Sequence, residues 1–118
     1  MSQLLSVDGR STEYVFYKNL EGEYEKFNPF TLVPPLLYFS ELRQYQIVQT
    51  DRNELTLFYV LQKNSADIKE QLSRTVNDSL EKLELDKLID PKLKQVDSID
   101  RNKRTGKFQV IKSLGPPT

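Results

Sequence analysis

The segment DRNKRTGKFQV, residues 100–110, places four cations and one glycine directly before an apolar run. Its Gly106-Lys107 pair suggests a phosphate-binding loop, in which backbone N–H groups and a lysine hold the phosphates of a nucleotide. The pattern G-x-x-x-x-G-K-[ST] requires glycine where Arg101 stands and a hydroxyl where Phe108 stands. Because both requirements fail, the sequence does not predict a phosphate-loop NTPase.

The same four cations could instead bind nucleic acid, since a basic patch is the electrostatic footprint of such binding. Two observations argue against it. Asp97 and Asp100 adjoin the cations and no aromatic residue interleaves them, whereas single-strand binding needs stacking platforms. The chain also has 17 basic and 17 acidic residues, so its net charge is +0 and composition forces no face to be basic. We expect no nucleic-acid partner, and the residues alone favour a solvated basic turn.

Composition removes most familiar catalytic groups. The chain has no cysteine and no histidine, which excludes disulfides, thiolate catalysis, cysteine-type zinc sites and the usual general base near neutral pH. We expect no metal site. The first ten residues do not look like a targeting signal, and no apolar run approaches the ~20 residues that span a membrane. The sequence therefore predicts a cytoplasmic chain without a membrane partner.

The elements that would position the basic loop begin with a β-hairpin. EYVFYK and EYEKFN, residues 13–18 and 23–28, are rich in aromatic and β-branched residues, and NLEG separates them. Asn19 and Gly22 can supply the left-handed backbone of the turn. Both faces of the first strand carry aromatic residues, so we expect at least one face to pack on the domain or on a partner.

A short helix and a second hairpin follow. Prolines in NPFTLVPPLLYFSELRQY exclude a long helix but suit a short one that starts at Pro35. Its apolar lining would consist of Leu36, Leu37, Phe39 and Leu42. YQIVQT and ELTLFYVLQK then flank the turn-forming DRN, and the second of these strands is apolar on both faces, as a central strand would be.

The remaining chain predicts one long helix and two short strands. Apolar residues recur with helical spacing from about Ser65 to Leu83, with Asn64 or Ser65 as the cap and Asp67 in the first turn. The stripe comprises Ile68, Leu72, Val76, Leu80 and Leu83. KLKQVDSI, after Pro91, and KFQVIKSL would be strands. Residues 1–118 would form a single α+β domain. It would have a mostly antiparallel sheet with helices packed on it, and a ferredoxin-like core preceded by the hairpin.

Five short motifs follow one another along this chain: Gly9-Arg10, Gly22 in the hairpin turn, VPPLL, YQIVQ, and Gly106-Lys107. In this order they resemble the C-terminal domain of the phenylacetate–CoA ligase and CapK-type branch of the adenylate-forming enzymes. The resemblance extends from about Asp8 to Leu114. It implies that the chain is the mobile C-terminal lid of an AMP-forming acid ligase.

The resemblance also implies a role for the basic loop. Lys107 would be the lysine that meets the acyl-adenylate, carried on a mobile turn with Arg104 and Gly106. The chemistry suits a lysine, because attack of a carboxylate on the α-phosphate of ATP brings two anions together and a delivered cation stabilises the developing charge. A register difference of a few residues would give this role to Lys103 or Arg104.

Three residues near the N-terminus acquire roles by the same resemblance. Arg10 would lie between the domains near the phosphate; the alternative is a surface arginine that pairs with Glu13 or Asp8. The hinge of the wider superfamily is usually an acidic residue or lysine shortly after the Gly-Arg pair. This chain departs from that pattern, because Thr12 occupies the hinge position and Glu13 adjoins it.

The resemblance implies partners that the chain itself lacks. The nucleotide pocket would lie in a large N-terminal adenylation domain, where ATP with magnesium, the carboxylic acid and possibly CoA would bind in the full-length enzyme. The isolated domain would be inactive and would bind none of these. The sequence does not identify the acid or the acceptor. The alternative function is a stand-alone ferredoxin-like binding or regulatory module without catalysis, whose hairpin aromatics form a partner interface.

Overall fold

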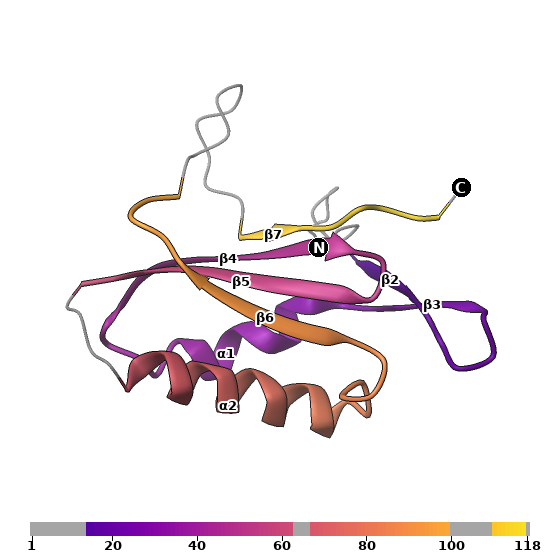
Figure 1. Cartoon of the computed structure of the whole chain (residues 1–118), viewed down its shortest axis with the longest axis horizontal. Helices are drawn as coiled ribbons and strands as arrows, with labels where there is room; N and C mark the ends of the chain where they lie inside the picture. The colour runs from indigo at the N-terminus through magenta and orange to yellow at the C-terminus, as the bar shows by residue number, and fades with distance from the viewer. Residues whose placement is uncertain (1–13, 63–66, 100–109, 118) are drawn as a thin grey trace, which may run out of the picture.

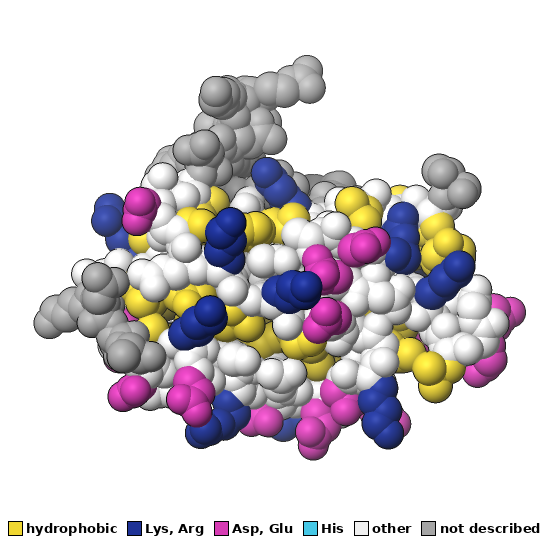
Figure 2. All heavy atoms as spheres, in the orientation of Figure 1, with side chains coloured by type: hydrophobic (Ala, Val, Ile, Leu, Met, Phe, Trp, Pro, Cys, Tyr) yellow, Lys and Arg dark blue, Asp and Glu magenta, His cyan; other side chains and the backbone are white. Residues whose placement is uncertain are grey.

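The computed structural model describes residues 14–62, 67–99 and 110–117. In these residues a two-stranded hairpin precedes a four-stranded sheet, and the helices lie against one face of that sheet (Figure 1). The predicted α+β class is confirmed. Basic and acidic side chains are interspersed over the face shown in Figure 2, as the balanced composition suggested.

The predicted N-terminal hairpin is confirmed: β2 (Val15–Lys18) and β3 (Tyr24–Phe27) pair antiparallel. Gly22 has a φ of 82° in the turn, as expected. Asn19 acts differently from the prediction, because its side-chain oxygen accepts hydrogen bonds from two backbone N–H groups of the turn. The core-facing side of the hairpin is buried, since Val15 and Tyr17 belong to the hydrophobic core.

The short helix begins earlier than the prediction placed it. A 3-10 turn, η2 (Pro29–Leu32), runs directly into α1 (Val33–Leu36). The predicted start at Pro35 is wrong because Asn28 caps the first turn: its side chain accepts a hydrogen bond from the backbone N–H of Phe30 at 3.0 Å, and a proline follows the cap.

The predicted apolar lining of this helix is only partly correct. Leu36 is buried, and Phe39 packs against the core from just beyond the helix. Leu37 is 67% exposed, and Leu42 begins the next strand. The helix spans only Val33–Leu36, which is too short to carry a stripe of four residues.

The second predicted hairpin forms the centre of the sheet. The four strands are β4 (Leu42–Asp51), β5 (Glu54–Leu61), β6 (Asp90–Gln95) and β7 (Ile111–Lys112), in the order β6-β5-β4-β7. β4 and β5 pair antiparallel, with Ile47 opposite Leu57. β5 is central, as predicted, and has buried side chains on both of its faces.

The strand pairing qualifies two expectations about the sheet. The central pair is antiparallel, but β6 pairs parallel to β5 and β7 pairs parallel to β4, so the sheet is mixed. The predicted element order α1-β4-β5-α2-β6 is present. A ferredoxin-like split unit would place another strand between β5 and β6, whereas here the two are neighbours. The helix between them is the crossover that such a parallel pair requires.

The long helix α2 (Ile68–Lys82) covers the sheet. Four residues of its predicted stripe are buried: Ile68, Leu72, Val76 and Leu80. Leu83 is not part of the stripe, because it follows the helix and is 39% exposed. Asp67 is the N-cap residue rather than a member of the first turn, and it makes no capping hydrogen bond through its side chain. Asn64 and Ser65 lie outside the described residues.

The predicted C-terminal strands are both present, with different bounds. Pro91 lies within β6 instead of before it, which its position at the edge of the described sheet allows because an edge strand tolerates a missing N–H. The described part of the last strand is Ile111–Lys112, and residues 107–109 of the predicted strand are outside the described range.

Candidate functional site

The residues to which the sequence assigned functional roles lie outside the described part of the chain. These are Lys107, Gly106 and Arg104 of the basic loop, its rival Lys103, and Arg10, Thr12 and Glu13 near the N-terminus. The segments that directly follow them are described: β2 follows the N-terminal set, and Val110–Lys112 follows the basic loop. The candidate site is therefore built from what holds these two segments.

Strand β4 holds the segment that follows the basic loop. The backbone N–H of Ile47 donates to the carbonyl of Val110 at 2.7 Å, and Ile111 lies opposite Ile47 in the parallel pairing. Ile111 is buried in the core. Val110 and Ile111, which follow Lys107 by three and four residues, therefore anchor the segment to β4, an interior strand of the sheet.

Gln49, near the end of β4, connects that tail to the hairpin. Its amide nitrogen donates to the carbonyls of Phe16 at 2.8 Å and Arg52 at 2.9 Å. Its amide oxygen accepts from the backbone N–H of Leu114 at 2.9 Å. The side chain is only 2% exposed, so these bonds replace water for a polar group that would otherwise be costly to bury.

The turn after β4 extends this connection. Arg52 donates through Nη1 to the carbonyls of Phe16 at 3.2 Å and Gly115 at 2.8 Å. Asn53 donates through its amide nitrogen to the carbonyls of Lys18 at 2.8 Å and Leu88 at 2.7 Å, and its amide oxygen accepts from Lys18 N–H at 3.0 Å. We call Gln49, Arg52 and Asn53 the β4 junction.

The β4 junction was missed at the level of sequence, where DRN was interpreted only as turn-forming. One signal was present: Gln49 is a long polar residue between the apolar Val48 and the turn, in a strand that the sequence paired with the central strand ELTLFYVLQK. Nothing in the sequence named its partners, because Phe16 is 33 positions away and Leu114 is 65 positions away.

Charged groups on the sheet tie its strands together. Glu54 of β5 accepts a hydrogen bond from Thr50 of β4 and lies 3.3 Å from Lys92 Nζ of β6. The Thr50 hydrogen bond and then the Lys92 ammonium hold the pKa of Glu54 below its usual value. This carboxylate is thus kept ionised, in a structural role that joins three strands.

The phenols of two tyrosines in the central strands lose a proton less readily than the phenol of an exposed tyrosine. Burial raises the pKa of Tyr45 and that of Tyr59, so both remain neutral phenols near pH 7. The Tyr59 hydroxyl is fully buried without a hydrogen-bond partner among the described residues. Within residues 14–62, 67–99 and 110–117, moreover, no group of three or more acidic side chains could hold a metal ion.

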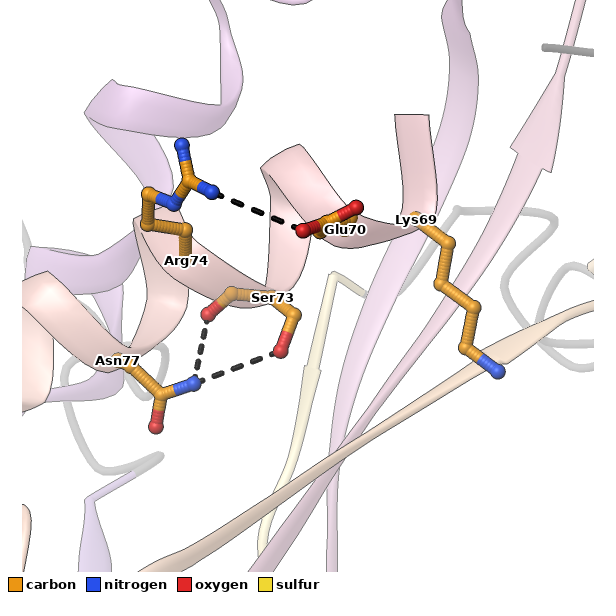
Figure 3. Close-up of a pocket in the computed structure, with 5 residues that line it drawn as sticks. All are labelled: Lys69, Glu70, Ser73, Arg74 and Asn77. Carbon is orange, nitrogen blue, oxygen red and sulfur yellow. Dashed lines mark hydrogen bonds and ion pairs between the residues drawn. The ribbon is translucent and has the colours of Figure 1, made fainter. Parts of the chain in front are cut away.

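The outer face of α2 forms a shallow hollow that also lacks reactive geometry (Figure 3). Its side chains interact with one another along the helix. Arg74 lies 3.7 Å from Glu70, and Asn77 donates to the carbonyl of Ser73 at 2.8 Å. Both pairs are spaced by four residues, as expected for neighbours on one helix face. The outer face of α2 thus carries charged and polar side chains that are largely exposed.

Neither α1 nor α2, nor any other helix in the described ranges, combines the length and the apolar character needed to cross a membrane.

The similarity of this chain to known proteins is to solved structures. No protein-family model matches the chain, and no curated protein matches it. The chain is similar to the crystal structure of a domain of phenylacetate-coenzyme A ligase from Bacteroides vulgatus ATCC 8482. The identity is 21%, the match covers 88% of this chain and 94% of that one, and the TM-score is 0.48.

Proposed function

We propose that this chain is the mobile C-terminal lid domain of an AMP-forming acid ligase, which supplies a catalytic lysine to a separate adenylation domain. One observation carries the proposal. Gln49, the last residue of the YQIVQ motif, binds the backbone of the strand that follows Gly9-Arg10 and of the tail that follows Gly106-Lys107. The described segments that follow the two motifs are thus held by one strand, an arrangement that supports a lid with both ends directed to the same active site.

In this proposal Lys107 acts on the first half-reaction. The substrate carboxylate attacks the α-phosphate of ATP, an acyl-adenylate forms and pyrophosphate leaves. The ammonium of Lys107 would contact the carboxylate and the α-phosphate as they join, offsetting the repulsion between two anions. Arg10 would lie at the domain boundary near the phosphate, and Thr12 with Glu13 would form the hinge on which the lid turns.

The other participants would bind mainly outside this chain. ATP and the carboxylic acid would occupy the N-terminal adenylation domain, and CoA is the acceptor we propose for the second half-reaction. Magnesium would be held there with the ATP phosphates, because the described residues of this chain offer no acidic cluster for it. The chain's own contribution is a positioned cation and a rigid sheet to carry it.

The test replaces Lys107 by Ala in the full-length ligase and measures the two half-reactions separately. We expect acyl-adenylate formation to slow by about 10²–10³-fold, the usual cost of removing one electrostatic contact in a transition state. Thioester formation from pre-made acyl-adenylate should change far less, because the lid is expected to rotate the loop away before that step. Lys103→Ala is the matched control in the same loop and should leave both steps nearly unchanged.

Other outcomes assign the loop differently. If Lys103→Ala slows adenylation and Lys107→Ala does not, the catalytic cation stands at the other position. If neither replacement affects the first step, or if both half-reactions slow equally, the proposed catalytic role of Lys107 is wrong. The stand-alone binding module then becomes the better account of the chain.

A further inference from the structure

The outward side of the β2–β3 hairpin carries aromatic rings and cations in alternation. The pairing sets Phe16 opposite Lys26 and Tyr24 opposite Lys18. Lys26 Nζ lies 4.7 Å from the centre of the Tyr14 ring, and Lys18 Nζ lies 5.7 Å from that of Tyr24. Arg52, from the β4–β5 turn, lies 5.9 Å over the Tyr24 ring. We call this set the hairpin face: Tyr14, Phe16, Lys18, Tyr24, Lys26 and Arg52.

The acidic residue of β3 lies on the other side of the hairpin. Side chains alternate along a strand, so Glu25 points with Tyr17, its cross-strand neighbour, away from the hairpin face. Its carboxylate accepts a hydrogen bond from the Asn19 amide at 2.6 Å. Glu25 is thus not placed to neutralise Lys18 or Lys26.

The cations of the hairpin face have no acidic partner among the described residues. The ion pairs of the described chain join Arg74 with Glu70 and Lys92 with Glu54, and both are elsewhere. Tyr24 is 48% exposed, and Lys18 and Lys26 are exposed as well. Basic side chains lie beside hydrophobic ones at the end of the molecule that carries the hairpin (Figure 2). The hairpin face thus combines three cations with aromatic rings and carries no carboxylate of its own, whereas the exposed Glu21 and Glu23 lie in the turn that connects the two strands.

We propose that the hairpin face docks an acidic segment of a protein partner. Carboxylates of such a segment would pair with the ammonium groups of Lys18 and Lys26, and its apolar side chains would cover the exposed ring edges. Aromatic residues and arginine are enriched where protein partners bind tightly, and opposite charge gives such a contact its specificity. Because the side chains that flank the rings are positively charged, the partner segment should be negatively charged.

The same geometry disfavours single-stranded nucleic acid, which also seeks cations and aromatic rings. Stacking needs a free ring face for each base. Here Lys26 already occupies a face of the Tyr14 ring, and Lys18 and Arg52 both lie over the Tyr24 ring. Strands of four residues also offer a short platform. This inference stands apart from the catalytic role proposed for Lys107, because none of its residues belongs to the basic loop.

Titrations of the isotope-labelled full chain, followed by NMR, test the proposal. The probe is a blocked octapeptide of Glu and Asp with two Leu residues, and its counterpart carries Gln and Asn in their place. We expect the acidic peptide to shift the amide signals of Val15–Lys18 and Tyr24–Phe27, and added salt to weaken the binding. The neutral peptide should shift them far less.

Charge-neutralised variants locate the contact. The double replacement Lys18→Gln with Lys26→Gln should weaken binding of the acidic peptide by about tenfold or more, as expected when the paired charges at a contact are removed. The matched control, Lys69→Gln with Lys82→Gln, removes the same charge from the exposed side of α2 and should leave the affinity unchanged. Unchanged amide spectra away from the hairpin verify that both variants remain folded.

Three results would overturn the proposal. In the first, the acidic peptide does not shift the amide signals of the hairpin. In the second, the two double variants lose affinity for the peptide equally, which would mean that binding depends only on the net charge of the chain. In the third case, a ten-nucleotide oligothymidylate would bind the hairpin face in preference to the acidic peptide, and the surface would be a nucleic-acid platform instead.

Discussion

At the scale of single residues, the side chain of Gln49 joins three separate segments of the described chain. One side chain bonds to the backbone of β2, of the β4–β5 turn and of the C-terminal tail. A neutral amide suits this position because it both donates and accepts without bringing a charge into the core. Arg52 reinforces the same connection through the carbonyls of Phe16 and Gly115.

Replacing Gln49 by Leu tests this role. The change keeps a similar volume but leaves the N–H of Leu114 and the carbonyl of Phe16 without this partner. We expect the free energy of unfolding to fall by about 1–3 kcal/mol, the range for stranding buried polar groups. Urea unfolding measures it. Gln71→Leu, the same change on the exposed side of α2, should stay within about 0.5 kcal/mol. Equal effects in both variants would contradict the role of Gln49.

At the scale of elements, the helix α2 and the edge strand β6 depend on each other. α2 leads from β5 to its parallel neighbour β6, and its buried residues share one core with Leu57 and Tyr59 of β5. α1 and η2 contribute Leu36 and Leu32 to that core from the same side of the sheet. The helical layer is therefore what covers this face of the central strands.

Truncating Leu72 measures how much α2 contributes. Leu72 is fully buried, so Leu72→Ala should lower the free energy of unfolding by about 2–5 kcal/mol through lost burial and the cavity left behind. The matched control is Leu83→Ala, which removes the same atoms from a residue that follows the helix and is 39% exposed. Thermal melts of both variants should separate them clearly, and coinciding melting temperatures would show that the stripe is not the main contact of α2.

At the scale of the whole molecule, the described chain is a framework of a hairpin, a sheet and the helices on that sheet. The residues with proposed catalytic roles lie outside the described ranges. Among the described residues no Asp, Glu, Lys or Arg is buried, and Glu54 joins strands through Thr50 and Lys92. The proposed lid would need a second domain to provide the nucleotide pocket. The hairpin face would be a further contact surface, for the acidic partner segment proposed above.

The purified chain alone should accordingly be inactive. We expect no ATP–pyrophosphate exchange with any carboxylic acid, since the chain has no histidine or cysteine and no phosphate-loop motif. Calorimetric titration with ATP should give at most weak binding. The same assay on the full-length ligase is the positive control. Exchange by the isolated chain would mean that it holds a complete adenylation site, and micromolar ATP affinity would favour a regulatory module.

The sequence by itself determined the local features of the fold. Alternating aromatic residues around Gly22 specified the first hairpin, the DRN turn specified the second, and helical spacing from Ile68 to Leu80 specified the buried stripe of α2. Each of these depends on residues close together in the chain, where periodicity and turn chemistry act directly. At Pro35, Leu42, Leu83 and Pro91 the sequence misplaced the boundary of an element and not its type.

Only the tertiary structure decided which distant segments meet. β6 pairs parallel to β5 and β7 pairs parallel to β4, and these pairings join residues separated by tens of positions. The hydrogen bonds of Gln49 and Asn53 do the same. Sequence patterns report which face of an element is apolar, but they do not state which edge of a sheet it will occupy. The choice depends on the burial of all elements together, because a strand takes the neighbour that lets the common core close.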